Sequence, residues 1–293
     1  MIAKKTRFRA LDVVIVLLCL AAGVILYYRI QYGLEYKGNW SAIPQFLFRR
    51  DAETGRLVPN YLLQGLLTTL KLSIWATILA LIVGVVIALF RTSTTLFLRM
   101  VGRTYVELIR NLPPLVLIFI FYFFVVDQIM PLFGVDAFIR SRSEGGQRVL
   151  AILLAEKSLF VQFISGIVTL AFFEGAYIAE VIRAGIESIE RGQREAAYSL
   201  GLSWLDEMRF VIMPQVIKRV LPALANEFIN TIKYSAIASV VSIQELTFMG
   251  RQVVVATRTI FETWITVSVM YMTLTLTLSL ATSQLEKKLR QSD

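Results

Sequence analysis

GQREAAYSLGLSW, at residues 192–204, is a polar stretch between two long apolar segments. At helical spacing, Glu195, Tyr198 and Leu202 fall on one face, and the small residues Ala196 and Ala197 lie beside them. A face with one acid and two bulky side chains among small neighbours suits docking against another protein. We therefore interpret the first part of this stretch as a docking helix.

A turn is predicted where this helix meets Gly201. Glycine adopts a positive backbone φ without steric cost, so the chain can change direction there. A second helix is expected to start near Ser203, and Pro214, in IMPQ at residues 212–215, is expected to limit how far it continues. The polar interval therefore predicts helix, turn, helix.

The spacing of Glu195-Ala196-Ala197, Gly201, Ile212 and Pro214 resembles the EAA loop of permease subunits in binding-protein-dependent ABC importers. A lone Glu-Ala-Ala carries no weight, because soluble helices also contain it, but the full spacing inside a membrane protein is specific. GAYIAEVIR at 175–183 and LPALAN at 221–226 make the chain similar to the polar amino acid permeases, of the His, Glu, Gln and Arg type. The likeness covers roughly residues 60–285. It implies that one set of residues couples the chain to an ATPase: Glu195, Ala196, Ala197, Gly201, Leu202, Ile212 and Pro214.

The composition is that of a membrane protein. Hydrophobic residues make up 56% of the 293 residues, charged residues only 17%, and the mean hydropathy is +0.66. The formal net charge of +9 does not indicate nucleic acid, because the basic residues are spread over short connecting loops without a basic stripe. Orientation in a lipid membrane explains this charge better.

Little catalytic chemistry is available to this chain. Its one cysteine, Cys19, excludes an intramolecular disulfide, and the absence of histidine excludes zinc-type clusters and Ser-His or Cys-His catalysis. We also find no Gly-x-x-x-x-Gly-Lys-Ser/Thr sequence, so no phosphate-binding loop of that type is present. No catalytic residue, metal site or cofactor is expected, and ATP hydrolysis is expected on another polypeptide.

The hydropathy pattern predicts an all-α membrane protein with about six membrane-spanning helices. The resemblance implies that these are one extra amino-terminal helix and a five-helix importer core, with a cytoplasmic coupling helix. The first span, residues 11–28, follows four basic residues. A signal peptide is the competing interpretation, but the run is longer than a usual signal core and no small-x-small cleavage site follows. The other spans are predicted at 62–90, 105–130, 160–183, 224–242 and 264–281. The predicted parts are 1–61, an amino-terminal helix and exterior loop; 62–285, the importer domain; and 286–293, a cytoplasmic tail.

Charge distribution predicts that both termini lie inside. The four inner segments then hold 15 Lys and Arg in about 72 residues, and the three outer ones hold 11 in about 80. Residues 244–262 are the last of these outer loops, and the apolar piece at 149–155 is too short to span and is expected at the surface. The docking helix falls inside.

Several local contacts are predicted from spacing. Ala80, Gly84 and Ala88 form a small-residue stripe for close helix packing. Leu112-Pro113-Pro114 is expected to break the third span, because two backbone donors are missing. The pairs Glu107 with Arg110 and Glu180 with Arg183 are each three residues apart and can pair on one face. Lys71, inside the second span, is expected to reach the interface or a neighbouring carbonyl rather than a substrate.

Polar residues inside the predicted spans mark a candidate translocation path. Glu174 is the deepest acid, and an isolated membrane carboxylate is expected to be protonated or to face a polar cavity. An unpaired Lys233 would cost roughly 2.5 to 3.5 kcal/mol, so Glu174, Glu227 or a cavity is expected nearby. For Lys233, a structural ion pair and a place on the path are equally weighted. The candidate path consists of Glu174, Asn226, Asn230, Lys233 and Ser235.

The resemblance implies a subunit of an ATP-driven importer in the bacterial cytoplasmic (inner) membrane, which passes a polar amino acid inward by alternating access. The implied partners are ATP-binding ABC subunits, a second permease subunit, a periplasmic amino-acid-binding protein and membrane lipid. The alternatives are an ion-coupled secondary amino-acid transporter, driven by titration of Glu174, Glu227 and Lys233, and a membrane scaffold without transport. The docking stretch favours the ATP-driven importer, because a secondary carrier has no use for a motor-docking helix.

Overall fold

The computed structural model describes residues 10–33, 38–52 and 55–290. The chain divides into two compact units, Met1–Ser41 and Ala42–Asp293. The first unit contains helix α1 (Ala10–Gly33), whose described side chains are exposed. Since α1 is apolar on every side and its 24 residues measure about 36 Å at 1.5 Å per residue, it is long enough to cross a bilayer.

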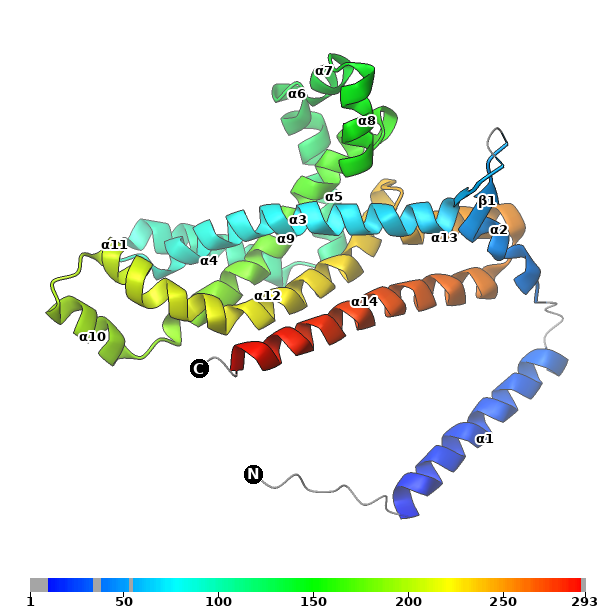
Figure 1. Cartoon of the computed structure of the whole chain (residues 1–293), viewed down its shortest axis with the longest axis horizontal. Helices are drawn as coiled ribbons and strands as arrows, with labels where there is room; N and C mark the ends of the chain where they lie inside the picture. The colour runs from blue at the N-terminus through cyan, green and yellow to red at the C-terminus, as the bar shows by residue number, and fades with distance from the viewer. Residues whose placement is uncertain (1–9, 34–37, 53–54, 291–293) are drawn as a thin grey trace. The chain divides into compact units, whose positions relative to one another are not determined.

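The second unit is almost entirely helical (Figure 1). Its long helices are α3 (Tyr61–Thr92), α9 (Phe160–Glu187), α12 (Met213–Ser235) and α14 (Ile260–Arg290). Its shorter helices are α2 (Pro44–Leu47), α4 (Leu96–Asn111), α5 (Pro114–Phe124), α6 (Met130–Leu132), α7 (Val135–Arg140), α8 (Glu144–Leu153), α10 (Arg191–Ser199), α11 (Trp204–Asp206) and α13 (Leu246–Thr257). The described part of this unit also contains the π-helical turns η2 (Val125–Ile129) and η4 (Glu207–Ile212) and the 3-10 turns η3 (Lys157–Leu159) and η5 (Ala236–Val241). A further 3-10 turn, η1 (Trp40–Ala42), includes the last residues of the first unit and the first residue of the second. We call the two extremes of the second unit the α10 end and the α13 end.

Among the described residues, five helical segments are long and apolar enough to cross a membrane: 11–29, 61–92, 114–132, 157–187 and 260–284. The remaining predicted span, at 224–242, corresponds to α12, which has 23 residues but is more polar and contains Pro222. This all-helical membrane architecture confirms the predicted fold class. The predicted start of this span at residue 224 is wrong, since α12 begins at Met213.

Helices α3 and α9 form the centre of the second unit, because small residues let their backbones approach closely. A Cβ added to Gly84 would overlap the Ile178 side chain, and one added to Gly175 would lie 2.8 Å from Val83 Cγ1. Ala80 and Ala88 are fully buried in the same cluster as Ile178. The predicted small-residue stripe is therefore a helix-packing surface.

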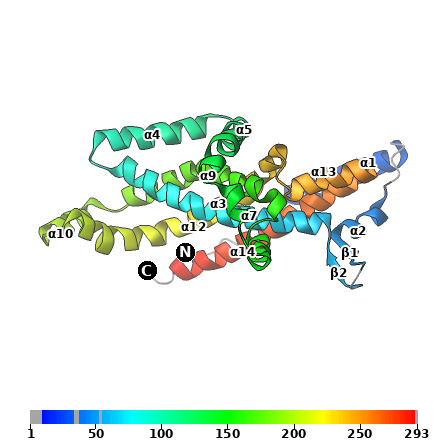
Figure 2. The same ribbon diagram turned by 90° about the horizontal axis from the view of Figure 1, so that it is seen from above.

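The predicted break in the third span is present. α4 ends at Asn111, Leu112 and Pro113 have extended backbones, and α5 begins at Pro114. Because proline lacks an N–H, it fits the first helical turn, where no partner is required. Figure 2 shows α4 and α5 as separate helices.

The α13 end differs from the sequence expectation in one respect. Residues 244–262, predicted as a loop, contain helix α13 and the start of α14. The Glu245 carboxylate accepts a hydrogen bond from Phe248 N at 2.8 Å and so caps α13, which explains why a helix begins there. A hairpin of β1 (Phe48–Arg50) and β2 (Leu57–Pro59) pairs Arg49 with Val58 near the same end.

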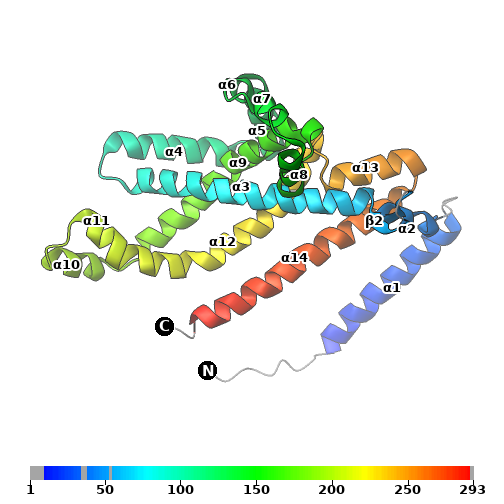
Figure 3. The same cartoon turned by 45° about the horizontal axis from the view of Figure 1, so that its top comes forward.

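The predicted surface piece at 149–155 belongs largely to α8. Two side chains of α3 hold the end of this helix: Lys71 Nζ donates to the Ala151 carbonyl at 2.9 Å, and Trp75 Nε1 donates to the Leu153 carbonyl at 3.0 Å. Lys71 therefore reaches a neighbouring helix's carbonyl, as predicted. Figure 3 shows α6, α7 and α8 grouped together beside α5.

Candidate functional site

Helix α10 ends in a left-handed glycine turn. Gly201 has φ +73°, its N–H donates to the Tyr198 carbonyl at 2.9 Å, and the Leu202 N–H donates to the Ala197 carbonyl at 3.2 Å. These two bonds form a Schellman motif, which satisfies carbonyls that the helix leaves free. The predicted helix and turn are thus present, and Gly201 fixes the direction in which the chain leaves α10.

The seven residues of the predicted coupling set do not share one face. Ala197 and Ile212 are buried, Leu202 is half-buried, and Glu195, Ala196, Gly201 and Pro214 are exposed. Ile212 is completely buried in the core cluster that also holds Ile186 and Met208. The exposed members of the set therefore form an outer surface, and the buried members, Ala197 and Ile212, anchor that surface in the core.

Two large apolar side chains project from the end of α10. Tyr198 is 82% exposed and Leu200 is 80% exposed. Glu195, three residues before Tyr198, is also exposed, and its side chain forms no ion pair within the described part of the chain. This outer surface of α10 is available to another protein.

Polar side chains of α12 tie this surface to the membrane helices. Arg219 donates to the Ser188 carbonyl, which follows α9, at 2.6 Å, and Gln215 donates to the Gln193 side chain of α10 at 3.4 Å. Sequence analysis did not find these contacts, because their partners are 31 and 22 residues apart. Movement of α10 can therefore be transmitted to α9 and α12.

The expected limit at Pro214 is wrong. α11, the π-turn η4 and α12 form one nearly continuous helical segment from Trp204 to Ser235, and Pro214 lies in the first turn of α12. A π-turn is wider than an α-helical turn, so the missing proline N–H and the proline ring are accommodated there. Ser203 caps the start of this segment by accepting a hydrogen bond from Asp206 N at 3.3 Å.

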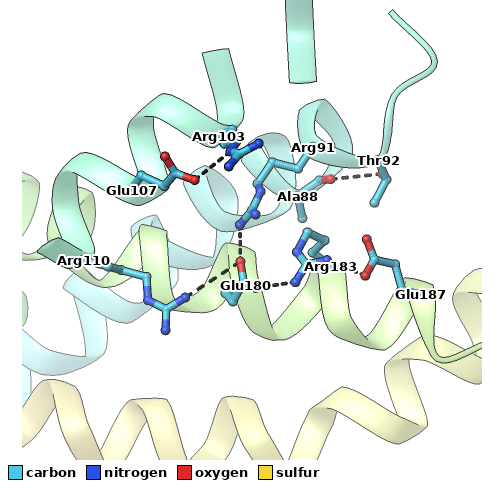
Figure 4. A network of polar contacts seen from close by, with 9 residues as sticks. All are labelled: Ala88, Arg91, Thr92, Arg103, Glu107, Arg110, Glu180, Arg183 and Glu187. Carbon is cyan, nitrogen blue, oxygen red and sulfur yellow. Dashed lines mark hydrogen bonds and ion pairs between the residues drawn. The ribbon is translucent and has the colours of Figure 1, made fainter. Parts of the chain in front are cut away.

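A cluster of charged side chains lies where α3, α4 and α9 meet (Figure 4). Glu180 of α9 pairs with Arg183 on the same helix and with Arg91 at the end of α3, and Arg110 of α4 lies 4.0 Å from it. Arg183 also pairs with Glu187. The predicted Glu180–Arg183 pair is confirmed, while Arg91 and Arg110 are partners that sequence analysis missed.

The predicted pair of Glu107 with Arg110 is wrong. Glu107 accepts instead from Arg103 at 2.7 Å, four residues earlier on the exposed face of α4 (Figure 4). This hydrogen bond raises the pKa of Arg103. Arg110 turns toward α9, where its guanidinium lies 5.6 Å from the centre of the Tyr177 ring.

The candidate translocation path brings a buried acid of α9 close to α12. Both carboxylate oxygens of Glu174 are buried; neither accepts a well-formed hydrogen bond from a described residue, and the nearby Thr231 hydroxyl of α12 donates to the Glu227 carbonyl at 3.0 Å instead. Glu174 and Glu227 are close enough to interact electrostatically, and the Tyr234 ring of α12 packs at 5.2 Å against Phe173, next to Glu174. A buried carboxyl group without a partner can accept or donate a hydrogen bond to a polar ligand.

The path residues on α12 are less buried. Asn226 and Lys233 are exposed, and Asn230 is half-buried and donates to Glu227 at 3.2 Å. Ser235 is buried and donates to the Ile232 carbonyl at 2.8 Å. Of the two equally weighted interpretations of Lys233, the ion pair with Glu174 or Glu227 is absent from the described part of the chain, and a place on the path stays a prediction. The Lys233 ammonium lies on an exposed face of α12 instead.

Comparison with known proteins agrees with this arrangement of helices. Residues 80–291 match the family described as the inner membrane component of binding-protein-dependent transport systems. The chain belongs to this family. As inner membrane components of this family, such chains are multi-pass transport subunits rather than enzymes, and a separate ATPase subunit hydrolyses ATP.

The alignment with this chain extends over nearly the whole length of each individual relative. The probable glutamine ABC transporter permease protein GlnM of Bacillus subtilis is 34% identical over 78% of this chain and 94% of its own. The arginine transport system permease protein ArtQ of the same organism is 30% identical over 80% and 94%. The glutamate/aspartate import permease protein GltJ of Escherichia coli is 28% identical over 86% and 95%.

Solved structures agree in fold. A crystal structure of an amino acid ABC transporter with histidines has a TM-score of 0.61 and 34% identity, covering 78% of this chain and 94% of that one. An inward-facing MetNI methionine ABC transporter has a TM-score of 0.56 at 18% identity, which supports the fold alone. The inner membrane component family thus accounts for the helical core and for its dependence on partner subunits.

Proposed function

We propose that this chain is the permease subunit that passes a polar amino acid inward in an ATP-driven importer. Family membership carries the proposal, because it requires a binding protein outside and an ATPase inside. Relatives named for glutamine, glutamate/aspartate and arginine support a polar amino acid as cargo. The partners are two ATPase subunits, a periplasmic amino-acid-binding protein and a second permease subunit.

The coupling element is α10 with its glycine turn. The exposed Tyr198 and Leu200 side chains offer apolar contact to an ATPase subunit, and Glu195 adds a charge at the same surface. Gln215 of α12 bonds to Gln193 of α10, and Arg219 of α12 bonds to Ser188, in the segment between α9 and α10. Closure of the ATPase subunits therefore displaces α10, and these contacts carry the displacement to the helices that bear the path residues.

The translocation path follows the α9–α12 interface, with Glu174, Asn226, Asn230, Lys233 and Ser235 as its polar residues. Glu174 supports this assignment most directly, because its buried oxygens accept no well-formed hydrogen bond from a described residue. Leaving such a group unsatisfied is costly, and a polar amino acid passing α9 would offer it a partner.

Reconstitution tests the proposal. The chain is purified with its partner permease and ATPase subunits, inserted into lipid vesicles, and supplied with the binding protein and radiolabelled L-glutamine, L-glutamate or L-arginine. Concentrative uptake of one amino acid is expected only with ATP and all subunits present. The chain alone should neither hydrolyse ATP nor accumulate amino acid under a proton or sodium gradient. Uptake driven by such a gradient without the ATPase would instead establish an ion-coupled transporter.

A further inference from the structure

A cavity of about 320 Å³ lies at the α13 end of the second unit, apart from the proposed translocation path. Its walls come from α3, from the end of α8 and the segment that leads into the start of α9, and from the segment that leads into α13 together with Met249 of that helix. None of its lining residues belongs to the candidate path. The path residues lie on α9 and α12, further toward the α10 end. The cavity volume lies at the lower end of the range for small-molecule sites.

One face of α3 lines the cavity, and its side chains become less exposed from Gln64 toward Lys71. Gln64, Leu67, Thr68 and Lys71 repeat at helical spacing, and the side chains change from exposed at Gln64 to half-buried at Thr68 and Lys71. Seven residues of helix correspond to about 10 Å. The cavity therefore extends from the α13 end of α3 toward the half-buried cation of Lys71.

Opposite charges line this cavity without contacting each other. Lys71 and Glu156 both face it, yet they form no ion pair. The bond from Lys71 to the Ala151 carbonyl uses one of the three N–H donors of an ammonium group, so two remain. Amide groups of Gln162 and Gln244 line the same space. The cavity thus presents a cation, a carboxylate and neutral donors and acceptors.

We propose that this cavity binds a free zwitterionic α-amino acid on the outer side of the chain, before it reaches the α9–α12 path. The ammonium of Lys71 receives the α-carboxylate, Glu156 accepts from the α-ammonium, and the glutamine amides contact a polar side chain. Charge-assisted hydrogen bonds of this kind are the strong ones in a partly buried site. The inference rests on the proposed function, since the ligand is the transported amino acid.

A purely structural role for Lys71 is the competing explanation, because Lys71 and Trp75 both hold carbonyls of the α8 segment. A strut of this kind would support the fold but would not distinguish ligands that differ in one charged group. The test therefore changes the ligand and the protein together.

Binding is measured by equilibrium dialysis on the purified permease–ATPase complex without the binding protein. The probes are radiolabelled L-glutamine, L-glutamate and L-arginine. The probe that binds is then compared with two analogues: its α-methyl ester, which lacks the α-carboxylate charge, and its des-amino analogue, which lacks the α-ammonium group. We expect saturable binding, with each analogue about tenfold weaker. In Lys71→Met the preference for the amino acid over its ester should disappear, and in Glu156→Gln the preference over the des-amino analogue should disappear. Lys71→Arg should retain the first preference.

Two matched variants serve as controls. Lys157→Met and Glu144→Gln make the same substitutions at exposed residues that do not line this cavity, and both should bind like the unaltered protein. Absence of saturable binding, or unchanged ligand preferences in both cavity variants, would overturn the proposed site. Uptake by the complete importer, measured in parallel, tells this failure from failure of the proposed function: normal ATP-driven uptake with no such binding leaves the importer intact and removes only the outer site.

Discussion

Glu180 has more cationic partners than the spacing of its own helix predicts. Its carboxylate is shared by Arg91, Arg110 and Arg183, which come from three helices, and its side chain is 25% exposed. Without this carboxylate, three guanidinium groups would face one another in a partly buried space. Glu180 therefore stabilises the junction of α3, α4 and α9 by neutralising repulsion as well as by direct hydrogen bonds.

Replacing Glu180→Gln should destabilise the subunit by about 2 kcal/mol, because charge-assisted hydrogen bonds are lost and the arginines are left together. The measurement is the apparent melting temperature in detergent, which should fall by several degrees. Glu107→Gln is the control, since it removes an exposed pair with Arg103 that contributes less than about 1 kcal/mol. Equal shifts for both variants would show that the Glu180 cluster has no special role.

Gly201→Ala should weaken coupling without unfolding the chain. A Cβ there meets no atom within 4 Å, but the φ of +73° costs a side chain about 1 to 2 kcal/mol, so the turn after α10 should relax. We expect lower substrate-stimulated ATP hydrolysis and uptake, with partial recovery in Gly201→Asn, which tolerates this conformation.

Gly192→Ala provides the matched control for this turn. Gly192 lies in α10, the helix that precedes this turn. It also has open space around an added Cβ, but its backbone φ is not positive. It should retain coupling. If Gly201→Ala and Gly192→Ala behaved alike, the left-handed turn would not be the coupling element.

At the scale of elements, the packing of α3 on α9 depends on side-chain size at a few positions. Both helices are apolar on their lipid-facing sides, so apolarity alone does not hold them together in a membrane. Close approach at Gly84 and Gly175 provides the van der Waals contact instead.

Gly84→Val should therefore separate α3 from α9 at the level of Ile178. Overpacking of this kind typically costs about 1 to 3 kcal/mol, and we expect less folded protein by size-exclusion chromatography and a lower melting temperature. Gly145→Val, on α8, adds the same side chain where nothing lies within 4 Å, and it should have little effect. A well-folded Gly84→Val protein would contradict this account of the interface.

At the scale of the whole molecule, the first unit contributes one apolar helix, since α1 is apolar all round. The segment after it carries Arg49, Arg50 and Arg56, which the proposed topology places outside, against the usual preference of basic residues for the inside. We infer that α1 directs this segment across the membrane.

Replacing α1 with an unrelated apolar helix of the same length and orientation should therefore leave assembly and uptake unchanged. Deleting residues 1–38 should reduce correct insertion, because the basic segment would have to cross unaided. Accessibility of a cysteine introduced at Asp51, in a Cys19→Ser background, measures the orientation of the segment. Loss of uptake in the replacement protein, despite correct insertion, would show that the sequence of α1 matters beyond its length.

Spacing within one element is enough to predict the membrane helices, the turn at Gly201, the break at Pro113 and the pair of Glu180 with Arg183. Which distant groups meet depends instead on how the helices pack in three dimensions. Arg91 reaches Glu180 across 89 residues, and Lys71 reaches Ala151 across 80. Tertiary packing also keeps the helix continuous through Pro214, because a π-turn accommodates the proline while the side chains of Met208 and Ile212 are buried in the core. Local spacing fixes neighbours along a helix, whereas packing of helices against one another selects among many partners of the same charge.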